Sequence, residues 1–258
     1  MVDEKAPPEK QGLHGWKAAL TVFGCGTLAA FGVFGVLIGI VGTFFNLTSS
    51  GIDTEGGGSS GGNPAEQIGE ARSSLGEGEM DVCGDNLDHL SSISTTRQDG
   101  GENYSDTASG GQPEIQGADR VVEDTCLWTL NPASGSPPWD FSFSYEAVID
   151  AADGGDPVDV ASERFEEIKA DLPSELAQVS SEGEAGFGDA SYAVHGTGET
   201  GNSAFIALIQ TKSAVYVIRF DDKADSSVGQ ISENEFKSEA RKIATFLGHG
   251  FTYWIPDA

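Results

Sequence analysis

The strongest constraint in this sequence is a run of 28 residues, 18–45, without a charged side chain. A helix of about 20 residues already crosses the hydrocarbon core of a bilayer, which is roughly 30 Å thick. Three lysines precede the run, whereas the next basic residue after it is Arg72. Because positive charge collects on the cytoplasmic side of a span, we predict a cytoplasmic leader over 1–17, a transmembrane helix over 18–45 and an extracytoplasmic remainder.

Two other interpretations of the run fit the residues less well. A cleaved secretory signal has a shorter apolar stretch and an A-x-A site, and no such site follows Phe45. Residues 22–25 (Val-Phe-Gly-Cys) resemble a bacterial lipobox, but Phe23 is bulky where a small residue is usual, and the apolar run continues far past Cys25. An uncleaved signal-anchor in the cell membrane is therefore the prediction.

Glycines form a stripe along the predicted span. Gly32, Gly35, Gly39 and Gly42 fall on one helix face, and Gly35 and Gly39 have the spacing that lets two transmembrane helices approach closely. The stripe predicts packing against a second span, contributed either by another copy of this chain or by a partner. The alternative is that transmembrane helices are simply rich in glycine.

The composition changes twice after the span. Residues 48–64 are mostly glycine, serine and threonine with almost nothing to bury, and the chain stays polar to about residue 80. We therefore predict a flexible Gly/Ser-rich linker over 46–80. Tryptophan, cysteine and apolar periodicity then begin, which indicates one extracytoplasmic domain over 81–250 and a C-terminal tail over 251–258.

Cys83 and Cys126 are the only cysteines outside the span. In an exported domain, an isolated pair of cysteines indicates a disulfide. A metal site is the alternative, but two thiols without a nearby pair of histidines make a poor zinc shell.

Apolar spacing within the domain predicts both helices and strands. Helical spacing occurs over 85–94, over 161–172 behind an Asp-Pro start, and over 232–247 behind a capping box, with a stop at Gly248. Strand patterns occur over 126–130, 139–149, 191–194, 204–211 and 214–220, the last two separated by a Lys-Ser hairpin turn. This order predicts an α+β domain with an antiparallel sheet packed with helices.

The charge of the chain excludes one class of partner. Asp and Glu number 41 against 14 Lys and Arg, giving a formal charge of −27, and residues 1–47 are neutral overall. A nucleic-acid binder needs clustered basic residues to neutralise phosphates, so no nucleic-acid partner is expected. The acidity keeps a domain soluble and is compatible with a basic partner.

The sequence contains no recognisable catalytic or cofactor motif in the required setting. There is no G-x-S-x-G elbow or G-x-G-x-x-G turn between a strand and a helix, no P-loop and no H-E-x-x-H helix. His89, His195 and His249 are not spaced as metal ligands or as a base beside a nucleophile. Four aspartates recur every third residue over 150–159, which fits a solvated acidic loop, with weak calcium binding as the alternative. We therefore predict a non-enzymatic protein with no cofactor, and we assign no residues as metal ligands.

One strand could contribute to a ligand site. Trp139, Phe141, Phe143 and Tyr145 alternate with polar residues and so share one face of their strand. They form either ordinary core or the wall of an apolar pocket between the sheet and its helices.

Three short motifs precede a closing amphipathic helix: Asp81-Val82-Cys83, Cys126-Leu127-Trp128 and Gly186-Phe187-Gly188-Asp189-Ala190. Together with that helix they resemble a group of actinobacterial cell-envelope lipoproteins and anchored ectodomains, over about residues 80–248. It implies an envelope location and supports the fold, whereas the group has no established activity. The chain departs from the group by having a full span where a lipobox is common.

These observations predict a membrane-anchored extracytoplasmic module that binds an envelope protein or associates with itself through the span. The alternative is a carrier or sensor domain that holds an apolar small molecule between the sheet and its helices.

Overall fold

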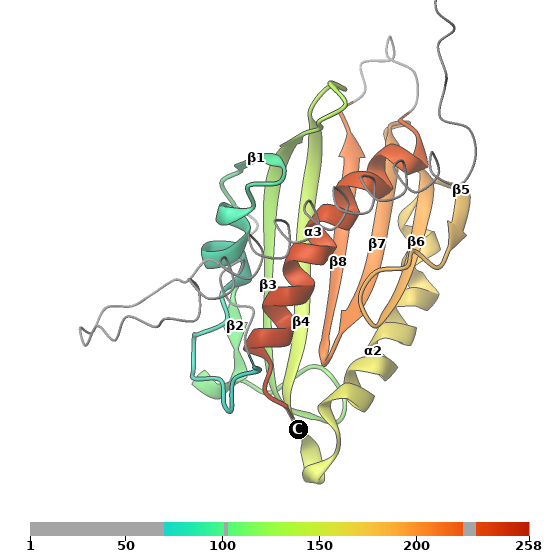
Figure 1. The fold of residues 1–258 in the computed structure, drawn as a ribbon. Helices are drawn as coiled ribbons and strands as arrows, with labels where there is room; N and C mark the ends of the chain where they lie inside the picture. The colour runs from blue at the N-terminus through green and yellow to red at the C-terminus, as the bar shows by residue number, and fades with distance from the viewer. Residues whose placement is uncertain (1–69, 101–102, 224–230, 258) are drawn as a thin grey trace, which may run out of the picture. The chain divides into compact units, whose positions relative to one another are not determined.

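The computed structural model describes residues 70–100, 103–223 and 231–257 (Figure 1). The predicted leader, the transmembrane helix with its glycine stripe, and linker residues 46–69 lie outside the described residues. Within these three ranges, no helix is both long and apolar enough to cross a membrane.

An antiparallel sheet of eight strands forms the centre of the domain. The strand order is β1-β3-β4-β8-β7-β6-β5, and β2 pairs with β3 beside this path. The strands are β1 (Ser94–Arg97), β2 (Ser105–Asp106), β3 (Ala118–Asn131), β4 (Trp139–Ala151), β5 (Gln178–Gly183), β6 (Ala190–Thr197), β7 (Ser203–Thr211) and β8 (Ala214–Asp222). The predicted Lys-Ser turn joins β7 to β8, and the predicted α+β class is confirmed.

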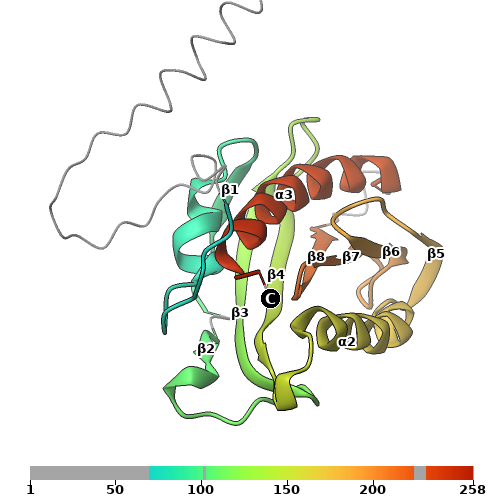
Figure 2. The same ribbon diagram turned by 60° about the horizontal axis from the view of Figure 1, so that its bottom comes forward.

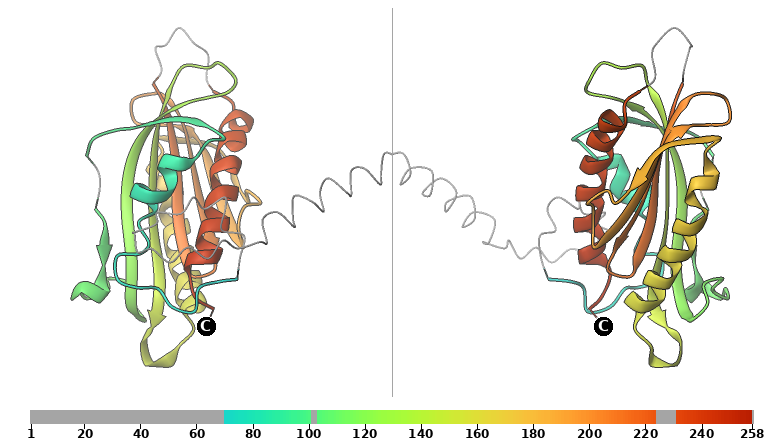
Figure 3. Two further views of the ribbon diagram at one scale, coloured as in Figure 1. Left: turned by 60° about the vertical axis from the view of Figure 1, so that its left-hand side comes forward. Right: turned by 90° about the vertical axis from the view of Figure 1, so that its right-hand side faces the viewer.

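Two long helices pack on opposite faces of this sheet (Figures 2 and 3). Helix α2 (Pro157–Asp171) begins at Asp156, whose side chain accepts a hydrogen bond from the Val158 amide. Helix α3 (Glu233–Trp254) begins at Ser232, whose hydroxyl accepts from the Glu235 amide. Because both faces are covered in part, the buried apolar residues form two clusters, one under each helix.

Short helical turns complete the fold: η2 (Val82–Asn86), η3 (Leu87–His89), η4 (Thr107–Ser109), η5 (Ala152–Gly154) and η6 (Leu172–Glu175). The amphipathic helix predicted over 85–94 is wrong, because the chain makes the turns η2 and η3 and then extends into β1. Leu87 and Leu90 are nevertheless buried, as the apolar spacing predicted. Pairing of β1 with β3 requires an extended backbone from Ser94 onward, which ends the helical segment early.

The ordered domain begins before the predicted boundary at residue 81. Leu75 and Met80 are buried at 6% and 1% exposure, and the Arg72 amide donates to the Tyr253 carbonyl. The guanidinium of Arg120 donates to the carbonyl oxygens at positions 75 and 76. These contacts are made with distant residues, so residues 70–80 are part of the domain although their composition is that of a linker.

The domain also ends later than predicted. Helix α3 continues through Gly248 to Trp254, and Phe251, Trp254 and Ile255 are buried within residues assigned to a tail. A glycine in a helix costs only about 1 kcal/mol relative to alanine. Burial of two aromatic side chains beyond it outweighs that cost, because each contributes about 1.5–3 kcal/mol or more.

Candidate binding groove

The four aromatic residues of β4 form the core between the sheet and α3. Trp139, Phe141, Phe143 and Tyr145 are each no more than 2% exposed. The Trp139 ring lies 4.6 Å from that of Phe236 on α3, measured between centroids. Similar ring contacts join the other three to β8 and to the end of α3. None of the four lines either of the two grooves described below.

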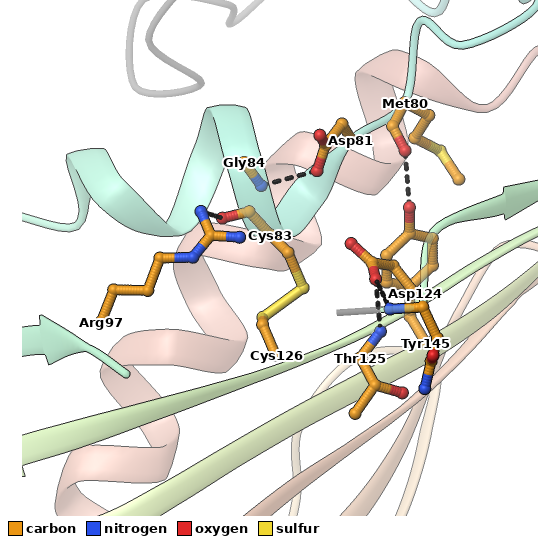
Figure 4. The surroundings of a disulfide bond; sticks show 10 residues. Met80, Asp81, Cys83, Gly84, Arg97, Asp124, Thr125, Cys126 and Tyr145 are labelled. Atoms are coloured by element: carbon orange, nitrogen blue, oxygen red, sulfur yellow. Dashed lines mark hydrogen bonds between the residues drawn. A yellow bond between two sulfur atoms is a disulfide. The ribbon is translucent and has the colours of Figure 1, made fainter. Parts of the chain in front are cut away.

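Cys83 and Cys126 form a disulfide, with Cα atoms 5.9 Å apart (Figure 4). Both side chains are fully buried, and the bond joins η2 to the middle of β3. The Asp81 carboxylate accepts from the Gly84 amide, and the Arg97 guanidinium donates to the Cys83 carbonyl. The disulfide prediction is confirmed, and its position beside the core gives these cysteines a structural role.

His195 and two aspartates of the acidic loop have structural roles, whereas His89 and His249 are exposed. His195 is half-buried within β6, and its Nε2 lies 3.2 Å from the Ile231 carbonyl oxygen. Asp156 caps α2, and Asp153 lies in η5 with a φ of 57°. Across the described ranges, no group of three or more His, Cys, Asp or Glu side chains is arranged to hold a metal ion.

A groove of about 640 Å³ lies on the opposite face of the sheet, between α2 and strands β4, β7 and β8. Helix α2 packs on these three strands through Ala161, Phe165 and their apolar neighbours. Strands β3 and β1 continue the sheet beyond β4. The groove, which we call the α2 groove, is lined by Ser142, Ser144, Arg164, Glu167, Ile168, Asp171, Leu172, Glu175, Ile206, Val217 and Arg219.

Strand register sets the floor of the α2 groove. Ser142 lies opposite Arg219, which in turn lies opposite Ile206, and Ser144 lies opposite Val217. Both serine side chains are half-buried, and neither hydroxyl has a hydrogen-bond partner in the described part of the chain. Two unused donor–acceptor groups therefore lie on the floor.

Both arginines of the α2 groove are already bound by carboxylates. Arg164 makes a two-pronged contact with Glu146, with nitrogen–oxygen distances of 2.7 and 2.9 Å. Arg219 donates to Asp221 at 2.6 Å and to Glu175 at 3.3 Å. Hydrogen bonds that each guanidinium donates to these carboxylates raise its pKa. The arginines therefore act as fixed parts of the floor, with their charge neutralised in place.

The α2 groove has a net negative charge, and three of its carboxylates lie along one wall. Two of the three, Glu167 and Glu175, each accept one hydrogen bond from a groove arginine, at 3.2 and 3.3 Å. Glu167, Asp171 and Glu175 follow one another at four-residue spacing along α2 and η6, beside the buried Leu172. The side chains of Glu167 and Glu175 are 67% and 58% exposed. Five carboxylates, counting Glu146 and Asp221, therefore surround two guanidiniums. The four-residue spacing is visible in the sequence, but the opposing strands are not, so sequence analysis missed this wall.

A scan against protein-family models and searches of curated proteins and of solved structures find nothing that matches this chain. The resemblance to actinobacterial envelope proteins therefore stays a prediction.

Proposed function

We propose that this protein is a single-pass membrane protein whose extracytoplasmic α+β domain is a non-enzymatic binding module of the cell envelope. The uncharged run over 18–45 and the lysines before it support the location. The α2 groove supports the binding role, and its exposed acidic wall is the observation that carries the proposal.

The chemistry of the α2 groove favours a basic, extended segment of a partner protein. The wall of Glu167, Asp171 and Glu175 offers acceptors to Lys or Arg side chains. Ser142 and Ser144 can bond with the backbone or polar groups of the same segment. A volume of about 640 Å³ is in the range of pockets that hold a few side chains. The charge of −27 would also speed the approach of a cationic partner.

Neutralising the acidic wall tests this proposal. The variant Glu167→Gln, Asp171→Asn, Glu175→Gln should weaken binding of a fluorescent tetralysine peptide by about tenfold or more, because each exposed pair contributes up to about 1 kcal/mol. The matched control is Glu70→Gln, Glu182→Gln, Glu184→Gln, which removes the same charge from exposed positions outside the α2 groove. Fluorescence anisotropy of the purified full chain at two salt concentrations measures both variants.

Equal loss of affinity in the two variants would show that only net charge acts, and would end the assignment of the α2 groove. A physiological partner co-purified from detergent-solubilised membranes should likewise depend on the wall. It should be lost from the groove variant and retained by the control.

A further inference from the structure

A second cleft lies at the end of the sheet where the C-terminus is found (Figure 1). It has a volume of about 760 Å³ and lies among the β7–β8 turn, the start of α2, residues 73–75 and residues 255–257. We call it the C-terminal cleft. We infer that it binds a small organic anion with an apolar part, a ligand class different from the basic partner proposed for the α2 groove.

The cleft contains cationic donors with unused N–H groups. The Lys212 ammonium has three N–H groups and donates two, to the Ile255 carbonyl at 2.9 Å and to the Asp257 carboxylate at 2.6 Å. The Arg120 guanidinium has five and donates four, to Asp106 and to two backbone carbonyls. Among the described residues, one N–H of each side chain has no acceptor and is left for a ligand. Neither side chain can accept a hydrogen bond, so the ligand must supply the acceptor.

A buried hydroxyl that lines the same cleft lacks a partner. Ser213 is 1% exposed, lines the C-terminal cleft, and its Oγ makes no hydrogen bond with any described residue. Leaving a buried hydroxyl unpaired is unfavourable. An acceptor from a ligand would remove that cost and would explain why a serine follows Lys212 in this turn.

The conformation of Lys212 supports a role for its side chain. Its φ of 50° is in the left-handed region, which glycine or asparagine adopts more easily than lysine. A lysine held in this conformation is unfavourable for the turn itself, and such outliers are concentrated at functional sites.

The cleft also has an apolar part and two competing carboxylates. Pro157, Val158 and Pro256 line it, and Val158 is 39% exposed, which is unusual for a large apolar side chain in this domain. Asp150 and Asp257 also line the cleft. The Asp257 side chain is 79% exposed and bound to Lys212, so an incoming carboxylate would replace it on that ammonium. The ligand is therefore an anion with an apolar tail that competes with Asp257.

Hexanoate is a suitable probe, with hexanol, hexylammonium and inorganic phosphate as comparisons. Binding to the purified full chain in lipid nanodiscs can be followed by NMR of the amides at positions 212 and 213. Hexanoate should shift both signals in a saturable manner, because it provides the carboxylate and the apolar tail together. The three comparison compounds should bind about tenfold more weakly or not at all, since each lacks the anion or the tail.

Four variants should change hexanoate affinity in different directions. Lys212→Gln should weaken hexanoate binding by about tenfold through loss of a charge-assisted hydrogen bond. Asp257→Asn should strengthen it by removing the competitor. Ser213→Ala should weaken it severalfold while leaving the melting temperature unchanged or higher, since an unpaired hydroxyl is removed. Lys242→Gln, a lysine bound to Glu239 on α3, is the control and should have no effect.

The proposal is overturned if hexanoate causes no saturable shift, or if hexylammonium binds as well as hexanoate. It is also overturned if Lys212→Gln and Lys242→Gln change the affinity equally. A Ser213→Ala variant that loses stability together with affinity would assign that hydroxyl to the fold instead.

Discussion

Two glycines in the turn before β6 differ in how closely they pack against the rest of the domain. Gly186 and Gly188 both have positive φ angles, of 73° and 55°. A Cβ atom at Gly186 would meet nothing within 4 Å, whereas one at Gly188 would collide with the Gln210 carbonyl oxygen and lie 2.8 Å from Ile209 Cγ2. Both glycines lie in the turn before β6, and the close approach to β7 is restricted to the second of them.

This difference predicts unequal effects of two alanine substitutions. Gly186→Ala should cost about 1 kcal/mol of unfolding free energy, because only the left-handed backbone conformation is penalised. Gly188→Ala should cost about 2–4 kcal/mol, because overpacking against β7 is added. Denaturant unfolding of both variants measures the difference, and equal losses would contradict the close packing of Gly188.

Asp124 is a buried carboxylate close to the disulfide and to Tyr145 (Figure 4). It is 4% exposed and accepts hydrogen bonds from the amides of Asn103 and Thr125. Burial raises its pKa above the usual 3.8, although these two hydrogen bonds and the charge of Arg97 oppose the shift. The charged form is therefore less favourable in the folded protein than in the unfolded chain.

We expect Asp124→Asn to change the pH dependence of stability. The carboxylate destabilises the fold at pH values above its raised pKa, and that penalty disappears as the pH falls toward 3.8 and the side chain is protonated. The asparagine oxygen can still accept both amide hydrogen bonds but does not titrate. The melting temperature of the wild type relative to that of the variant should therefore rise as the pH is lowered from 7 to 4. A constant difference over this range would contradict the raised pKa.

At the scale of elements, the disulfide attaches the N-terminal turns to the sheet. It closes a loop of 43 residues that contains the short strands β1 and β2. In the chain-entropy model, such a cross-link stabilises a domain by roughly 3–4 kcal/mol by restricting the unfolded chain. The turns η2 and η3 are too short to be stable helices alone, so the bond and the burial of Leu87 keep them in place.

Removing the bond should destabilise the domain without affecting the predicted span. Cys126→Ser should cost roughly 2–4 kcal/mol and lower the melting temperature by several degrees or more. Cys25→Ser, in the predicted span, is the matched control and should leave the melting temperature of the domain unchanged. Alkylation of the unreduced chain should label Cys25 alone, and labelling of all three cysteines would contradict an oxidised domain.

At the scale of the whole molecule, the predicted span separates two parts of the chain that differ in net charge. The first 47 residues are neutral overall, so the entire charge of −27 lies on residues 48–258. Disulfides persist in oxidising surroundings, so the Cys83–Cys126 bond is compatible with the proposed extracytoplasmic position of the domain.

Protease treatment tests this topology. We expect protease added to intact cells or spheroplasts to digest the domain, while an epitope tag before residue 17 stays protected. Disruption of the membrane should then expose the tag, which provides the control. Protection of the domain in spheroplasts would overturn both the orientation and the proposed envelope function.

The sequence by itself determined the elements that have a recognisable local residue pattern. Helices α2 and α3 have capping residues and apolar spacing, and β4 alternates apolar with polar residues, so local patterns were sufficient to predict them. The two cysteines outside the predicted span were sufficient to predict the disulfide. These features depend on periodicity and on cysteine chemistry, both of which can be read within a short window.

Only the tertiary structure decided the rest, because it depends on pairing between distant residues. Strand β5 (Gln-Val-Ser-Ser-Glu-Gly) has no strand composition and is extended because it pairs with β6 at the edge of the sheet. Leu75, Met80 and Trp254 are buried by contacts with residues far along the chain. Both grooves combine side chains from at least three elements, so spacing along the sequence could not reveal them.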